Sequence, residues 1–104
     1  GDVPRALNLY SRALDLDPNS ATLHSNRSAA YLRLGERHQA LKDAQRSVSL
    51  DPSYAKGHYR MAAALAKLHR FEDALHACDT ALALEPESEA LVLLRQQCKD
   101  EVER

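Results

Sequence analysis

Three polar side chains in the middle of this chain, Asn26, Lys56 and Arg60, have residue types and spacings suited to binding carboxylates. Lys56 precedes Arg60 by four residues, so on a helix the two cations share one face. Asn26 precedes Arg60 by the same interval that separates Pro18 from Pro52. Guanidinium and ammonium groups form charge-assisted hydrogen bonds with carboxylates, and an asparagine amide adds neutral donors. These residue types favour recognition of an acidic ligand.

The same three residues are unfavourable for a helix considered alone. The asparagine side chain competes for backbone hydrogen bonds, so Asn26 is a poor mid-helix residue. Like charges four residues apart, as at Lys56 and Arg60, destabilise a helix by a few tenths of a kcal/mol. Local inconsistency of this kind is expected at functional sites, which strengthens the binding hypothesis.

The segments that carry these side chains belong to an internal repeat. Pro18, Pro52 and Pro86 recur at a constant interval. A period of 20–50 residues is typical of repeat architectures, and this interval falls within it. Four further columns keep the register: Ala6, Ala40 and Ala74; Leu7, Leu41 and Leu75; Leu16, Leu50 and Leu84; and the acidic Asp17, Asp51 and Glu85.

Apolar residues follow helical spacing within each repeat, and no segment alternates as a strand would. Gly35 interrupts one stretch and suits the positive φ of a helix C-terminus. Asp51-Pro52 ends the next, because proline disfavours the α conformation in the residue before it. The pattern predicts an all-α solenoid of antiparallel helices, with Ala40, Ala44, Ala74 and Ala81 at the helix contacts. The predicted helices are 3–16, 20–34, 37–50, 54–68, 71–84 and 88–102.

This 34-residue helix-turn-helix unit resembles the tetratricopeptide repeat, and the resemblance covers essentially the whole chain. It is carried by the small residues Ala6, Ala13, Ala40, Ala74 and Ala81, by Tyr10 and Tyr31, and by the three prolines. The departures are mild: Ser47 replaces a small alanine, and Ala44 and Cys78 replace a large aromatic. The resemblance implies one domain, divided into the second helix of a truncated repeat (1–19), two complete repeats (20–53 and 54–87) and a capping helix (88–104).

By this register, the first helix of the first repeat is absent, and we interpret the chain as a fragment. Its first helix is then expected to expose an apolar strip of Leu7, Tyr10 and Leu14. We expect this strip to fray or to mediate self-association.

Composition excludes several classes of function. Lysine and arginine number 14 and aspartate and glutamate 15, so the overall charge favours neither nucleic acid nor membranes. No apolar run approaches the roughly 20 residues that span a bilayer. Cys78 falls on a packing face, which predicts a buried free thiol and suits a reducing, cytoplasmic location.

No constellation for catalysis, metal or cofactor binding is found. The five histidines do not pair with each other or with cysteine at metal-site spacing. His24 and His58 occupy equivalent positions in successive repeats and are assigned to packing. No glycine-rich loop could cradle a phosphate. We therefore expect a binding module rather than an enzyme.

The segments around the three polar residues closely resemble the carboxylate-clamp subclass of tetratricopeptide repeats. The marks are the run Ser25-Asn26-Arg27-Ser28-Ala29-Ala30-Tyr31 and the pattern Lys56-Gly57-X-X-Arg60. Members of this subclass are co-chaperones that bind the C-terminal Glu-Glu-Val-Asp of 70-kDa and 90-kDa heat-shock chaperones. The resemblance implies that Asn26 donates to the main-chain terminal carboxylate, that Lys56 and Arg60 hold the aspartate side chain and neighbouring acidic groups, and that Ala29 and Ala63 leave room for an extended peptide.

One departure from the subclass bears on this expectation. Its members also use a lysine and an asparagine from the first helix of the first repeat, which this chain lacks. Two alternatives stay open: a generic scaffold that binds another partner, and a module that targets a catalytic domain elsewhere in a larger protein. The sequence does not choose between the two chaperone classes.

Overall fold

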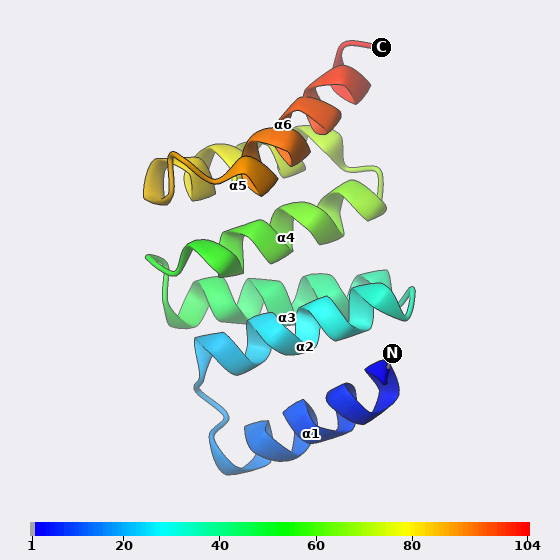
Figure 1. Cartoon of the computed structure of the whole chain (residues 1–104), viewed down its shortest axis with the longest axis vertical. Helices are drawn as coiled ribbons and strands as arrows, with labels where there is room; N and C mark the ends of the chain where they lie inside the picture. Colours follow the sequence, from blue (N-terminus) through cyan, green and yellow to red (C-terminus); the bar gives the residue numbers. More distant parts are fainter. Residues whose placement is uncertain (1) are drawn as a thin grey trace.

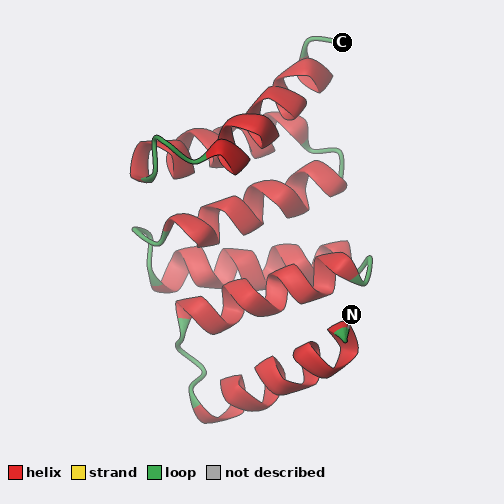
Figure 2. Cartoon of the chain, in the orientation of Figure 1, coloured by secondary structure: helices red, strands yellow, loops and turns green. Residues whose placement is uncertain are grey.

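The structure, a computed structural model, describes residues 2–104. These residues form six α-helices and no strand, which confirms the predicted fold class (Figure 2). Each predicted helix boundary lies within one residue of the observed boundary. The helices are α1 (Val3–Leu16), α2 (Ala21–Arg33), α3 (Arg37–Leu50), α4 (Ala55–Lys67), α5 (Phe71–Leu84) and α6 (Glu89–Val102).

The helix ends follow the repeat register. Ser20 and Ser88 cap α2 and α6, where their hydroxyls accept hydrogen bonds from the amides of Leu23 at 3.1 Å and Leu91 at 3.3 Å. After α2, Gly35 has the expected positive φ of 80°, and the equivalent His69 after α4 has a φ of 61°. Glycine adopts this conformation without strain, whereas histidine has a Cβ that disfavours it. The two turns therefore share a geometry although their residues differ.

The helices stack along the long axis of a molecule measuring 42 × 26 × 20 Å (Figure 1). Each helix packs against the next one in the chain. In addition α2 contacts α4, and α4 contacts α6. These three helices therefore form one continuous inner face, while α1, α3 and α5 form the outer layer.

Small residues let the helices approach closely. Ala40, Ala44, Ala74 and Ala81 are all fully buried, which confirms their predicted place at the helix contacts. At the contact between α3 and α4, a Cβ added to Gly57 would lie only 2.8 Å from the Ser47 hydroxyl. Gly57 is thus fixed by packing, although it sits inside the Lys-Gly-X-X-Arg pattern.

The core also contains both cysteines. Cys78 and Cys98 are buried free thiols, as predicted for Cys78. Burial removes the thiolate from water and raises the pKa of Cys78 to about 11, and it raises the pKa of Cys98 as well. At neutral pH both side chains are protonated and behave as small apolar groups.

The prediction for α1 is wrong in part. Leu14 is buried with 6% exposure, because it packs into the interface with α2, whereas Leu7 and Tyr10 are half-buried. The large apolar side chains that α1 exposes are Leu9 and Leu16, with exposures of 55% and 90%. Between residues 2 and 104, no helix is both long and apolar enough to cross a membrane.

Candidate ligand-binding site

The predicted binding residues lie on the two central helices of the inner face. Asn26 is on α2, and Lys56 and Arg60 are on the neighbouring α4. Lys56 is exposed, and the other two are half-buried. All three side chains are therefore open to a ligand from solvent.

Lys56 and Arg60 line one cavity of about 150 Å³ between α4 and α6. The Arg60 guanidinium lies 5.1 Å from the ring centre of Tyr59, within cation–π distance. The Arg60 Nε is buried without a hydrogen-bond partner. Neither cation forms an ion pair within residues 2–104. The cavity therefore holds two unpaired cations, one of them with an unused buried donor.

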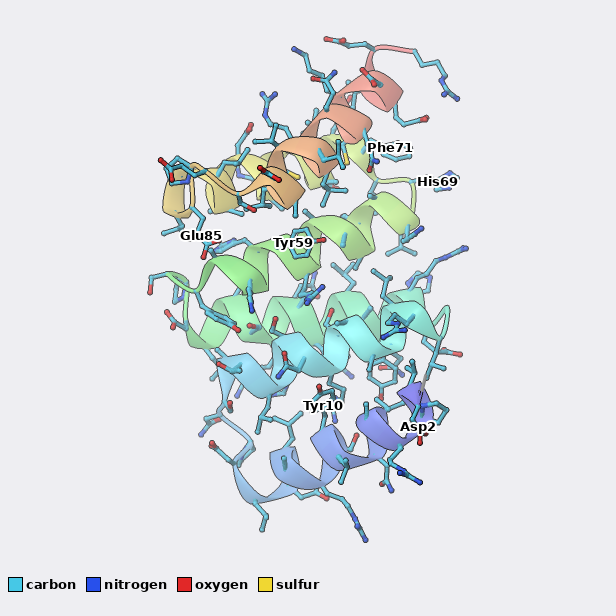
Figure 3. All side chains as sticks on the ribbon, viewed as in Figure 1. Asp2, Tyr10, Tyr59, His69, Phe71 and Glu85 are labelled. Atoms are coloured by element: carbon cyan, nitrogen blue, oxygen red, sulfur yellow. The ribbon has the colours of Figure 1, made fainter. Side chains whose placement is uncertain are left out.

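Asn26 and Ala29 line a second, larger cavity of about 300 Å³ between α1 and α2. Arg33 contributes a further cation to its wall, and Asp2 contributes a carboxylate. Tyr10 of α1 faces this cavity, and both Tyr10 and Asp2 are marked in Figure 3. Asn26 on α2 thus lines a different cavity from the one that Lys56 and Arg60 line on the neighbouring α4.

Ala63 lines a third cavity of about 370 Å³, farther along α4. Phe71 and Leu94 give its wall an apolar character, and Lys67 and Glu101 also line it. The five predicted residues are thus distributed over three hollows. Asn26 and Ala29 share one, Lys56 and Arg60 share another, and Ala63 belongs to the third.

His24 and His58 are buried, as their assignment to packing predicts. Each also makes the same polar contact with the loop before its helix. Nε2 of His24 lies 2.9 Å from the Pro18 carbonyl oxygen, and Nε2 of His58 lies 2.8 Å from that of Pro52. The ring nitrogen donates to the carbonyl in both repeats, so these histidines tie each loop to the following helix.

Known repeat families match this chain over most of its length. A family model described as "TPR repeat" matches residues 1–35. Two models described as "Tetratricopeptide repeat" match residues 21–54 and 55–88. The chain belongs to the tetratricopeptide repeat (TPR) family.

Two solved TPR domains are similar to this one over nearly its whole length. One is described as "First TPR of Spaghetti (RPAP3) bound to HSP90 peptide SRMEEVD". It has a TM-score of 0.96 and 29% identity, with coverage of 100% of this chain and 85% of the other. The other is the second TPR domain of human RPAP3 in complex with HSP70 peptide SGPTIEEVD. It has a TM-score of 0.88 and 32% identity, with coverage of 95% and 82%.

Relatives in sequence are much longer than this TPR domain. Tetratricopeptide repeat protein 28 of Mus musculus is 50% identical over 44 residues, which are 42% of this chain and 2% of that protein. Hsp70-Hsp90 organizing protein 3 of Arabidopsis thaliana is 43% identical over 42 residues, which are 40% of this chain and 8% of that protein. The chain therefore spans a small part of either relative.

Sequence reasoning missed two features of this TPR domain. One is an ion pair between Arg27 of α2 and the buried Asp43 of α3. The other is Glu85, which enters the cavity of Lys56 and Arg60 from the connection between α5 and α6. The sequence contained a signal for the ion pair: Arg27 and Asp43 are both charged, whereas the next repeat has apolar Met61 and Ala77 at the equivalent positions. The placement of Glu85 beside Lys56 and Arg60 depends on how α6 packs against α4, which no local pattern encodes.

Proposed function

We propose that this TPR domain is a co-chaperone-type binding module that holds the acidic C-terminal peptide of a 70-kDa or 90-kDa heat-shock chaperone on its inner face. The observation that carries the proposal is the pair of cations, Lys56 and Arg60, which share a cavity and form no ion pair with any residue of 2–104, although Glu85 lines the same cavity. A ligand carboxylate supplies the missing partner.

In this proposal Lys56 and Arg60 hold the side chain of the terminal aspartate. Arginine offers two parallel donors to a carboxylate, and lysine adds a point charge. The buried Nε of Arg60 has no partner in residues 2–104, and a carboxylate that reached it would remove the cost of an unsatisfied donor.

Asn26 is assigned to the main-chain terminal carboxylate, from the neighbouring cavity on α2. Arg33 lines the same cavity and supplies a positive charge there. Ala29 and Ala63 are small, half-buried residues and leave room for an extended peptide on α2 and α4. A peptide terminus presents two carboxylates at once, so it engages both helices.

Two similar solved TPR domains carry such peptides, which supports this choice of ligand. The role is one of binding, with no reaction assigned to these residues. With these chaperone partners, the function is assigned to the cytoplasm.

The test is a titration of the protein with the peptide SRMEEVD, as the free acid and as the C-terminal amide. A short peptide held by a few charge-assisted bonds is expected to bind at roughly micromolar Kd, about 8 kcal/mol. Affinity should fall as salt rises, because exposed charges are screened beyond about 8 Å at physiological ionic strength. The amide should bind much more weakly than the acid.

Substitutions locate the binding to the proposed residues. Arg60→Ala and Lys56→Ala should each weaken binding by about 2 kcal/mol, because each leaves a desolvated ligand carboxylate short of a partner. Lys42→Ala is the matched control, since Lys42 is exposed on α3, in the outer layer. If the acid and amide bind alike, or if both inner-face variants behave like Lys42→Ala, the proposal fails and the general scaffold takes its place.

A further inference from the structure

We propose that Glu85 is a specificity-determining residue, which limits the cavity of Lys56 and Arg60 to a ligand group carrying one negative charge. This inference rests on the proposed function, because it concerns which acidic group that cavity accepts.

Glu85 directly follows α5 and lines the same cavity of about 150 Å³ as Lys56 and Arg60. Figure 3 shows Glu85 between the end of α5 and the first turns of α4. The Glu85 carboxylate forms no hydrogen bond and no ion pair with any residue of 2–104 that would fix it elsewhere. It is therefore available to act on whatever enters the cavity.

The preceding repeat shows why this carboxylate is free. Asp51 stands at the equivalent position of that repeat. Its Oδ1 accepts hydrogen bonds from the Ser53 amide at 3.1 Å and from the Ser53 hydroxyl at 2.7 Å, so it is held within its own turn. The equivalent of Ser53 is Glu87, which has no hydroxyl to donate. The Glu85 carboxylate therefore lacks the hydrogen bonds that hold Asp51 in its turn. Its side chain is also longer than that of Asp51 by one methylene.

Charge counting gives the consequence for specificity. Two cations and one carboxylate leave the cavity with one net positive charge, which a single ligand carboxylate neutralises. Glu85 and Lys56 are both exposed, so solvent screens this site in part. A dianionic group would still bring a second negative charge close to Glu85 in a small cavity, where the like charges repel each other. A terminal aspartate side chain meets this condition, and a phosphate dianion does not.

The experiment compares two peptides on three proteins at pH 7.5. The peptides are SRMEEVD and the same peptide with its terminal aspartate replaced by phosphoserine, which is close to a dianion at this pH. The proteins are the parent chain, Glu85→Gln and the control Glu87→Gln. Glutamine keeps the shape of glutamate without its charge, and Glu87 is exposed two residues away, outside that cavity.

We expect the parent chain to bind the aspartate peptide more tightly than the phosphoserine peptide. Glu85→Gln should improve binding of the phosphoserine peptide by about tenfold and of the aspartate peptide by about threefold, because the repelled charge is larger in the first case. Glu87→Gln should leave the ratio of the two affinities at its parent value. Thermal denaturation of the three proteins checks that all are folded to the same degree.

Two failures are distinguishable. If the peptides bind but Glu85→Gln changes their affinity ratio no more than Glu87→Gln does, Glu85 has no role in specificity while the proposed function stands. If the parent chain binds neither peptide, the proposed function is overturned, and the inference about Glu85 with it.

Discussion

Arg27 of α2 donates two parallel hydrogen bonds to the carboxylate of Asp43 on α3. Its Nε donates to Oδ2 and its Nη2 donates to Oδ1, each over 2.8 Å. Asp43 is only 5% exposed, and Nδ1 of His24 lies 3.3 Å from the same Oδ1. The hydrogen bonds to Asp43 raise the pKa of Arg27 above its usual value. This partly buried pair joins the two helices of one repeat.

The first prediction concerns the stability that this pair provides. Asp43→Ala should lower the free energy of unfolding by about 3 kcal/mol, because it leaves a partly buried guanidinium without its partner. Asp73→Ala is the control, since its pair with Arg70 is exposed on both sides and should contribute less than about 1 kcal/mol. Urea denaturation measures both. Equal losses in the two variants would show that burial gives the Arg27–Asp43 pair no special weight.

This pair shows where sequence reasoning reaches its limit. The six helices follow from a local signal repeated three times, and this signal predicts their boundaries to within one residue. The contact between Arg27 and Asp43 joins residues 16 positions apart on two helices. Whether such residues meet depends on the rotation of each helix about its axis, which apolar periodicity specifies only loosely.

The candidate site could likewise be predicted from the sequence only in part. Register alone selects Asn26 and Arg60 as equivalents, and a spacing of four places Lys56 on the same helix face. Register does not reveal that Asn26 faces α1 while Lys56 and Arg60 face α6. Those neighbours are set by which helices pack together, α1 on α2 and α6 on α4.

The second prediction tests whether Gly57 is present for packing. Alanine is better than glycine in a helix by about 1 kcal/mol, so Gly57→Ala would stabilise an isolated α4. In the protein the new Cβ would lie 2.8 Å from the Ser47 hydroxyl, which itself donates to the Ala21 carbonyl over 2.8 Å. Moving that hydroxyl breaks a part-buried hydrogen bond, so we expect a net destabilisation of about 1 kcal/mol.

The matched variant removes the obstacle to that alanine. In Ser47→Ala/Gly57→Ala the clashing hydroxyl is absent. The free energy of unfolding of this double variant should be about 1 kcal/mol higher than the value obtained by adding the two single effects. Strict additivity in urea denaturation would show that Ser47 does not restrict position 57.

The third prediction concerns Cys78 and alkaline pH. The unfolded thiol titrates near pH 9, and burial raises the pKa of Cys78 in the folded chain to about 11. Between these values the unfolded state binds fewer protons than the folded state, so stability is complete below pH 9 and falls as pH rises. Unfolding should cost about 1 kcal/mol less at pH 10 than at pH 8 from this group alone.

Lysine and tyrosine also titrate in this range, so the measurement compares the parent chain with Cys78→Ala. The variant is expected to be less stable at pH 8 and to lose less stability on going to pH 10. Cys98 titrates in both proteins, and its negative charge is one cause of the raised pKa of Cys78, so the difference between the proteins reports Cys78 together with this coupling. If the two proteins lose the same free energy between pH 8 and pH 10, Cys78 does not govern this part of the profile.

The last prediction separates structure from recognition on α4. His58 lies on the same helix as Lys56 and Arg60, two residues from each, yet its side chain is 6% exposed and points into the protein. His58→Ala removes the donor to the Pro52 carbonyl and leaves a buried space. We expect a loss of about 2 kcal/mol of stability, since an unsatisfied carbonyl and lost packing act together. His76→Ala, at an exposed site on α5, should change stability by less than about 0.5 kcal/mol.

Peptide binding should depend on Arg60 rather than on His58. Below its unfolding transition, His58→Ala should bind SRMEEVD with the parent Kd, because its side chain lines none of the cavities that hold Lys56, Arg60 or Asn26. Arg60→Ala should do the reverse and lose affinity with a stability loss below about 1 kcal/mol, since Arg60 forms no ion pair within the described chain and only its cation–π contact with Tyr59 is lost. A folded His58→Ala protein that binds the peptide as weakly as Arg60→Ala would place His58 among the binding residues and contradict its assignment to packing.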